Sequence, residues 1–227
     1  MVSIIIPVFN EEKQIGNLLK YLREASSEKI FEIIIVDGGS RDKTVQILAS
    51  EKNIVVLNSP KGRARQMNAG AAIAKAPVLY FLHADSYPPH NFDSLILKET
   101  AKGNLAGCFR MNFDHKHWWL NFMGQLTRIN HRFCRGGDQS LFIDKKLFRQ
   151  LGGFNENYSI YEDNEIISRL YQKKQFVVIQ EWITTSARLY LKMGIFRTQL
   201  VHFQIYYRKW RGTGPEELHR LYKSKVS

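Results

Sequence analysis

Apolar runs alternate with amphipathic stretches through the first 88 residues. The continuous β-branched run at 2–8 suits a strand that is buried on both faces, and shorter runs predict further strands at 31–36, 53–57 and 77–82. Between these runs, apolar residues return at helical spacing, as from Ile15 to Leu22, and residues 63–75 also predict a helix. The alternation predicts an α/β fold with a mainly parallel central sheet and helices on both faces.

Polar residues after two of these strands predict where the helices begin. Asn10 is expected to cap the first helix, with Glu11 and Glu12 in its first turn, because carboxylates favour a helix N-terminus. Ser40 is expected to cap the second helix in the same way.

After residue 88 the alternation becomes irregular. Helical patterns cover 90–101, 117–132 and 162–173, strand patterns cover 105–113 and 175–180, and GGDQSLFID predicts a glycine turn into a strand. The tail from about 193 is helical and basic. No linker rich in Pro, Gly or Ser is present, so we expect one domain over 1–227. Within it we expect a first half at about 1–88, a second half at about 89–190 and a basic helical tail at about 191–227.

The charge balance adds an expectation about partners. The chain has 33 Lys and Arg against 21 Asp and Glu, a formal net charge of +12. A nucleotide, a phosphorylated substrate, an acidic membrane face and nucleic acid all suit such a surface, and a plain basic solvated surface is the alternative. No nucleic-acid recognition motif is present, so we expect no nucleic-acid partner.

Cysteine usage and hydropathy indicate the cellular compartment in which we expect the protein. Cys108 and Cys134 form no CxxC pair, which argues against a disulfide framework and a structural zinc site, and we expect both to be buried thiols. No signal-peptide pattern and no run of about 18 apolar residues occurs. We therefore expect a cytoplasmic protein, with peripheral contact to the cytoplasmic membrane face left open.

Polar side chains follow the predicted strands and open one helix, and open α/β sheets bind ligands at the carboxyl ends of their strands. At the end of its strand, Asp37 can meet a ribose or cap the turn. Asp85 can bind a hard divalent cation, whereas a lone histidine such as His83 is more often structural. Glu162 and Asp163 are adjacent, so they point to different sides of a helix, and acidic residues in a first turn also serve the helix dipole.

Basic residues open the helix predicted at 63–75. Arg63 and Arg65 can meet a pyrophosphate together with free backbone N–H groups, or they form an exposed basic edge. The glycines of VDGGS do not fit GxGxxG, and no GxxxxGK[ST] loop occurs. These absences argue against a hydride-transferring Rossmann enzyme and against a P-loop enzyme.

The order of four blocks, SIIIPVFNEE, VDGGSRDKT, FLHADS and YEDNEI, resembles the family 2 inverting glycosyltransferases of the GT-A fold over about residues 1–190. VDGGSRDKT matches the family's VDDGS.D.T block with Gly38 in place of the second Asp. His83-Ala84-Asp85 matches the metal-binding DxD with its first Asp lost, and Glu162-Asp163 matches the ED motif. HAD and TTSAR together resemble a bacterial subgroup of small stand-alone enzymes. The processive motif QxxRW is absent, which favours transfer of one sugar.

The resemblance implies a nucleotide-binding half at about 1–88 and an acceptor half at about 89–190, and it implies a role for each of these positions. The donor would be a nucleoside diphosphate sugar of UDP or GDP, and the acceptor a hydroxyl of a lipid or a small molecule. Asp163 would be the catalytic base, Glu162 would orient the acceptor or the helix, and Asp85 would hold Mg²⁺ or Mn²⁺ against the diphosphate. The residues implied to bind the nucleotide sugar are Pro7, Phe9, Asn10, Glu11, Asp37, Arg63, Arg65, His83, Ala84 and Gly137.

Two other functions compete with this interpretation. A nucleotidyltransferase has a similar sheet, but it would show a Gly-rich N-terminal loop with a basic residue, which PVFNEE is not. A catalytically weak nucleotide-sugar-binding partner protein would fit the incomplete DxD, although the Glu162-Asp163 pair argues against it.

Two aromatic segments have several interpretations. HKHWWLNFMGQLTRINHRF suits an interfacial membrane helix, an aromatic wall for an acceptor, or a helix that faces the core. From Arg188 onward the tail has nine Lys or Arg against two Glu. It can dock on an anionic membrane, wrap around the domain or form a dimer.

Overall fold

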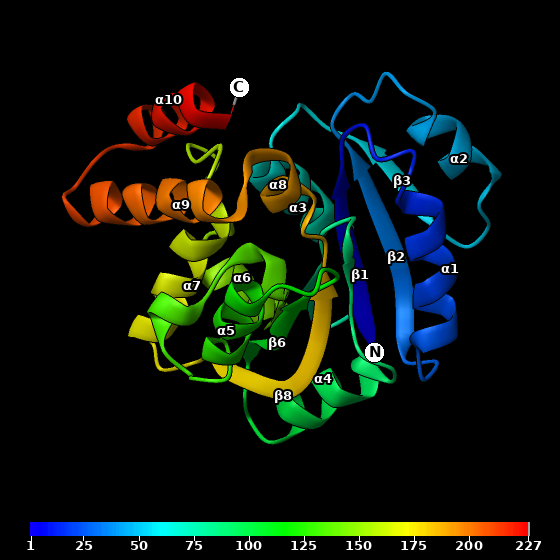
Figure 1. Cartoon of the computed structure of the whole chain (residues 1–227). Helices are drawn as coiled ribbons and strands as arrows, with labels where there is room; N and C mark the ends of the chain where they lie inside the picture. The colour runs from blue at the N-terminus through cyan, green and yellow to red at the C-terminus, as the bar shows by residue number, and fades with distance from the viewer. Residues whose placement is uncertain (227) are drawn as a thin grey trace.

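One mixed sheet runs through the chain (Figure 1). In this computed structural model, which describes residues 1–226, the strands lie in the order β3-β2-β1-β4-β7-β6-β8-β5. They are β1 Val2–Val8, β2 Ile30–Asp37, β3 Val55–Asn58, β4 Val78–Phe81, β5 Ser86–Tyr87, β6 Ala106–Phe113, β7 Leu141–Asp144 and β8 Val177–Thr185. β1 pairs in parallel with β2 and β4, and β2 with β3, whereas β7 runs antiparallel to β4 and β6. The predicted parallel arrangement is therefore found in the first half, and the second half adds antiparallel strands.

Helices lie on both faces of this sheet. They are α1 Ile15–Ala25, α2 Thr44–Ser50, α3 Arg63–Ile73, α4 Phe92–Ala101, α5 Trp118–Leu126, α6 Lys145–Gln150, α7 Glu162–Gln172, α8 Arg188–Met193, α9 Ile195–Trp210 and α10 Pro215–Val226. Figure 1 shows α1 and α2 at one end of the molecule, and α9 beside α10 at the other. Among the described residues, every helix is too short or too polar to span a bilayer.

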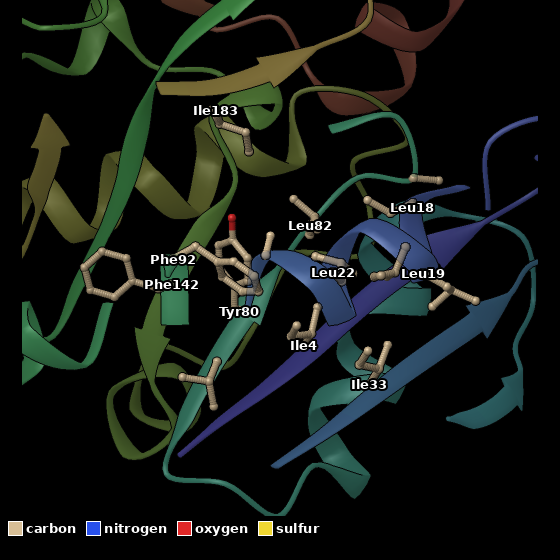
Figure 2. Close-up of a cluster of buried hydrophobic side chains, with 14 of the residues drawn as sticks. Ile4, Leu18, Leu19, Leu22, Ile33, Tyr80, Leu82, Phe92, Phe142 and Ile183 are labelled. Carbon is tan, nitrogen blue, oxygen red and sulfur yellow. The ribbon is translucent and has the colours of Figure 1, made fainter. Parts of the chain in front are cut away.

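The central strand β1 is buried along its whole length. Successive side chains of a strand point to opposite faces, so a continuous apolar run needs a covering helix on each side. Ile4 packs with Leu18 and Leu22 of α1 on one face (Figure 2), whereas Ile5 belongs to the cluster formed with α3 and α7 on the other. Each such side chain stabilises the fold by about 1.5–3 kcal/mol.

A close approach fixes α3 against the sheet. A Cβ atom on Gly70 would lie 2.5 Å from Cγ2 of Ile5 and 3.1 Å from Cγ2 of Val36. Only glycine lets the helix come this near to β1 and β2. As a result, the first residue of α3, Arg63, lies near the carboxyl ends of those strands, at the cavity described below.

The two predicted helix caps are wrong. α1 begins at Ile15 and α2 at Thr44, each several residues after its expected cap. Asn10 instead has a left-handed backbone (φ 57°), and its Oδ1 accepts a hydrogen bond from the Arg41 N–H at 2.8 Å. Ser40 accepts from the Asn10 N–H at 2.8 Å. The capping side chains bind the neighbouring loop, because the two loops lie side by side at the ends of paired strands.

The predicted helix at 117–132 is shorter in the structure. α5 ends at Leu126, and Arg132–Cys134 forms a separate 3-10 turn. The buried guanidinium of Arg135 accounts for the break, since it donates to the carbonyl oxygens of Thr127 and Ile129 at 2.6 Å each. These carbonyls therefore bind a side chain instead of continuing the helix.

The sheet crosses the predicted internal boundary at about 88. β4, from the first half, pairs with β7, and β6 pairs with β8 over a longer stretch than the strand predicted at 175–180. The division at about 88 and 190 stays a prediction.

Both cysteines are free thiols; Cys108 is buried as expected, whereas Cys134 is only partly buried.

A buried carboxylate joins α4 to the loop after α1. Asp93 accepts hydrogen bonds from the N–H groups of Ser27 and Lys29 and from the hydroxyls of Ser26 and Ser27. Burial alone would raise the pKa of Asp93, but these hydrogen bonds outweigh it and hold the pKa below its usual range.

We expect Asp93→Asn to lower the free energy of unfolding by roughly 2 kcal/mol at neutral pH, because the charged acceptor is lost. A carboxyl group whose pKa is lowered by folding stabilises the fold at pH values above its unfolded-state pKa of about 3.9. This stabilisation is lost as the pH falls through the folded-state pKa. The gap between wild type and variant should therefore close in acid. Urea unfolding at several pH values measures it, with the exposed Glu24→Gln as control. A gap that persists unchanged in acid would contradict the assignment.

Candidate functional site

A cavity of about 730 Å³ opens at the carboxyl ends of β1 and β4. Parallel pairing brings the loops after these strands to one edge of the sheet, which is where open α/β sheets bind ligands. Its charged part includes Glu11, Arg63, His83, Asp85, Asp138, Asp163 and Arg188, with the small residues Pro7, Ala84 and Gly137 beside them in the lining. Its apolar part includes Met111, Phe113, Met123, Leu126, Phe133 and Phe203. The cavity thus joins a charged end to an apolar end.

His83 lies between two carboxylates. Its Nδ1 is 3.5 Å from Oδ1 of Asp138, and its Nε2 is 3.5 Å from Oδ2 of Asp163. Burial alone lowers the pKa of His83, but the hydrogen bonds with Asp138 and Asp163 outweigh it and raise the pKa to about 10. The ring therefore carries a positive charge at neutral pH and offsets part of the negative charge of this end of the cavity.

A glycine makes this contact possible. A Cβ atom on Gly137 would lie 2.1 Å from Oδ2 of Asp163 and 2.9 Å from Cε1 of His83. A larger residue would push both side chains away. Gly137 therefore contributes to the site by its lack of a side chain, and its neighbour Asp138 contributes the second carboxylate.

Glu162 and Asp163 open α7 and point in different directions, as their adjacency predicts. Glu162 is fully buried and its Oε1 is 2.6 Å from Nε of Arg63, whereas Asp163 lines the cavity. Burial raises the pKa of the Glu162 carboxyl above its usual range, although Arg63 lowers it. Tyr161, just before the pair, has a left-handed backbone (φ 73°), which turns the chain into the helix.

Asp85 belongs to a charged cluster with two partners. Its Oδ2 is 3.1 Å from Nη2 of Arg188, and the same guanidinium donates to both carboxylate oxygens of Glu11 at 2.7 and 2.8 Å. Burial raises the pKa of the Asp85 carboxyl above its usual range, although His83 and Arg188 lower it. Arg188 thus ties the start of α8 to the loop after β1.

Four of the predicted nucleotide-binding residues lie outside the cavity lining. The Asp37 carboxylate accepts hydrogen bonds from the N–H groups of Gly39 and Ser40, so it closes the turn after β2. Arg65 faces Glu156 at 3.8 Å, and Phe9 lies under the ammonium of Lys61 at 3.6 Å. Asn10 is exposed and binds the neighbouring loop. Their roles toward a nucleotide stay predictions.

Sequence reasoning missed three residues of this region. Asp138 had a signal, since an acidic residue follows the glycine pair in GGDQ, and Arg188 ends the TTSAR segment. Gln66 had none. Its buried amide donates to the carbonyl oxygens of Val8 and Val36, and a Cβ atom on Gly38 would lie 3.1 Å from that amide. The glycine that replaces the usual Asp therefore makes room for Gln66.

The donor set restricts how a metal could be held. Within residues 1–226, no three His, Cys, Asp or Glu side chains converge as a metal cage. Both ring nitrogens of His83 already contact carboxylates. Within the HAD motif, this leaves the carboxylate of Asp85 to bind a cation at the cavity. Mg²⁺ is commonly held by one or two carboxylates together with substrate phosphates. The residues therefore fit a cation held jointly by Asp85 and a diphosphate.

Comparisons with known proteins agree on one family. The family model described as Glycosyl transferase family 2 matches residues 3–150. A transferase from Pseudomonas paraeruginosa (strain DSM 24068 / PA7), named undecaprenyl-phosphate 4-deoxy-4-formamido-L-arabinose transferase, is 31% identical over 128 residues. A protein of the same name from Pseudomonas savastanoi pv. phaseolicola is 34% identical over 128 residues. Each match covers 52% of this chain but only 38% of the relative.

Solved structures agree on the fold. The crystal structure of S. aureus TarS 1–349 in complex with UDP has a TM-score of 0.68 and 18% identity, and covers 82% of this chain and 60% of that one. The crystal structure of S. aureus TarS has a TM-score of 0.65 and 18% identity, over 88% of this chain and 39% of that one. At this identity the likeness concerns the fold alone, and it confirms the predicted α/β fold of GT-A type.

We expect Gly137→Ala to break the contact between His83 and Asp163, because the new methyl group would occupy the space of the carboxylate. Without that partner, the pKa of His83 should fall from about 10 toward its ordinary value. NMR titration of the histidine ring, from neutral into alkaline pH, measures the change. Gly136→Ala is the matched control, because its Cβ would meet nothing within 4 Å. An unchanged His83 titration in Gly137→Ala would refute the predicted crowding.

Proposed function

The chain belongs to glycosyl transferase family 2, and from this membership we propose that it transfers one sugar from a nucleoside diphosphate sugar to a hydroxyl acceptor, with inversion at the anomeric carbon. The observation that carries the proposal is the charged end of the cavity. There, Asp163 of the family's ED motif and Asp85 of the HAD motif line one space, together with Arg63 and Arg188.

The donor is bound at the charged end. Guanidinium groups recognise phosphate oxygens through paired hydrogen bonds, and the N–H groups that open a helix add to the attraction. Arg63 is the first residue of α3, and its side chain is 46% exposed although it pairs with buried Glu162. Pro7 and Glu11 line the same space from the loop after β1. We propose UDP or GDP as the nucleotide.

Asp163 acts as the base in the transfer. Its carboxylate accepts the proton of the acceptor hydroxyl while that oxygen forms a bond to the anomeric carbon. The bond from the anomeric carbon to the diphosphate oxygen breaks, and the nucleoside diphosphate leaves with the electron pair. His83 and Asp138 hold Asp163 in position, since His83 contacts both carboxylates. Attack opposite to the leaving group inverts the configuration.

In this proposal one residue of the chain, Asp85, would bind a divalent cation. When bound, Mg²⁺ or Mn²⁺ neutralises charge on the diphosphate leaving group. Asp85 would hold it with the diphosphate oxygens, in exchange for part of its contact with Arg188. Arg188 keeps its two hydrogen bonds to Glu11, so it can remain in place as a second positive group.

The names of the relatives support a second candidate acceptor. The two Pseudomonas proteins are named as undecaprenyl-phosphate transferases, and the phosphate of such a carrier is already ionised. Transfer to a phosphate oxygen needs no base, whereas transfer to a hydroxyl needs one. The apolar end of the cavity suits either kind of lipid. The dependence of transfer on Asp163 therefore separates the two acceptors.

We expect Asp163→Asn to abolish transfer to a hydroxyl acceptor while donor affinity stays within a few-fold, because the amide cannot accept the proton. Donor turnover and calorimetric donor binding measure the two effects. Glu165→Gln is the matched control, since this acidic residue of the same first turn pairs with Arg169. Near-normal turnover in Asp163→Asn would rule out the assigned base and favour a phosphate acceptor.

We expect Asp85→Ala to remove the effect of Mn²⁺ on donor binding. Thermal stabilisation by UDP, GDP and their sugars, with and without Mn²⁺, measures it, because a ligand that binds the folded state raises the melting temperature. Asp163→Asn serves as the control and should keep the metal effect. Equal metal effects in wild type and Asp85→Ala would exclude this carboxylate, and no shift with any nucleotide or nucleotide sugar would contradict the proposed donor.

A further inference from the structure

An apolar stripe runs along the solvent side of α9. Its residues follow helical spacing and each is more than half exposed: Phe196 54%, Leu200 60%, Phe203 53%, Tyr207 57% and Trp210 73%. The opposite side of α9 is already covered, since Val201 and Ile205 pack with Leu218 of α10. A helix on a protein surface normally turns its apolar stripe inward. Here one apolar face meets α10 and a second one faces solvent.

The stripe continues onto α5. The ring of Phe196 lies 6.2 Å from that of Trp118 and 5.9 Å from that of Trp119, and Trp119 lies 5.7 Å from Phe122. Trp118 and Phe122 are 65% and 50% exposed. We call these residues of α5 and the α9 stripe the aromatic face. Contiguous exposed apolar surface of this kind marks an interaction site.

The two segments that form the aromatic face carry charged residues of one sign. Neither segment that forms it, 115–137 or 182–215, contains an Asp or a Glu. Both segments carry exposed basic residues: Lys116, Arg128, Arg132, Lys192, Arg197 and Arg211. Aromatic rings with surrounding Lys and Arg suit the headgroup region of an anionic bilayer. A second copy of the chain fits poorly, because it would bring two basic faces together.

The aromatic face also borders the cavity. Phe203 belongs to the stripe and lines the apolar end, together with Phe133, which is 65% exposed. We propose that the aromatic face docks on an anionic lipid bilayer and that the acceptor enters the apolar end of the cavity from that membrane. The membrane docking is argued from the aromatic face and its basic residues alone, whereas the entry of the acceptor rests on the proposed transferase function.

Sedimentation with vesicles tests the docking. We expect the wild-type chain to bind vesicles of phosphatidylcholine and phosphatidylglycerol and to bind pure phosphatidylcholine weakly. The double variant Phe196→Glu/Leu200→Glu should bind the anionic vesicles at least about tenfold less. The matched control Phe31→Glu/Val56→Glu adds the same charge at residues that are 48% and 44% exposed on β2 and β3, and it should bind like wild type. Nucleotide binding in solution should be equal in all three proteins.

A measurement on the unchanged protein adds a second test. Three of the four tryptophans, Trp118, Trp119 and Trp210, lie on the aromatic face, whereas Trp182 lies in β8 under Arg110. Brominated lipids should therefore quench most of the tryptophan fluorescence when the chain binds anionic vesicles.

Three results would overturn the docking: no binding of wild type to anionic vesicles, equal binding of the aromatic-face variant, or a dimer that this variant disrupts. The last result would assign the face to a second copy. Vesicle binding without any nucleotide binding would keep the docking and reject the transferase function, so the two failures are distinguishable.

Discussion

The parallel pairing of β1 with β2 on one side and β4 on the other is the constraint on which the site depends. It brings the loop with Glu11 and the loop with Asp85 to one edge of the sheet. Because β1 is buried along its length, a shift of its pairing register by one residue would move each apolar side chain to the opposite face of the sheet, against the other set of helices. Helix α3 is held to the same strands at Gly70, which brings Arg63 to the same edge.

Each carboxylate at this edge lies beside a basic group. Glu162 is buried against Arg63, Asp85 and Glu11 share Arg188, and His83 lies between Asp138 and Asp163. A buried charge without a partner is costly, so each pairing also holds its side chains in place. In the HAD motif, the missing first carboxylate is replaced by a positively charged ring. The site therefore carries less negative charge toward the proposed diphosphate donor than a full DxD would.

The second half of the chain builds the other wall. Arg135 ends α5 early by binding the carbonyls of Thr127 and Ile129, and the following turn delivers Gly137 and Asp138 to the cavity. Helix α9 closes the apolar end with Phe203 while its stripe faces outward. One helix thus contributes both to the apolar end of the cavity and to the proposed membrane surface.

The sequence by itself determined the order of strands and helices in the first half and the different directions of the Glu162 and Asp163 side chains, because local hydrophobic periodicity and helix geometry decide these features. It did not determine the start of α1 and α2. Asn10 and Ser40 have side chains that commonly cap helices, but each accepts a hydrogen bond from the adjacent loop instead. Nor did it reveal that Asp138 and Asp163 share His83, or that Gln66 fills the space beside Gly38. Only the tertiary structure decided these, because each depends on contacts between residues distant in the chain.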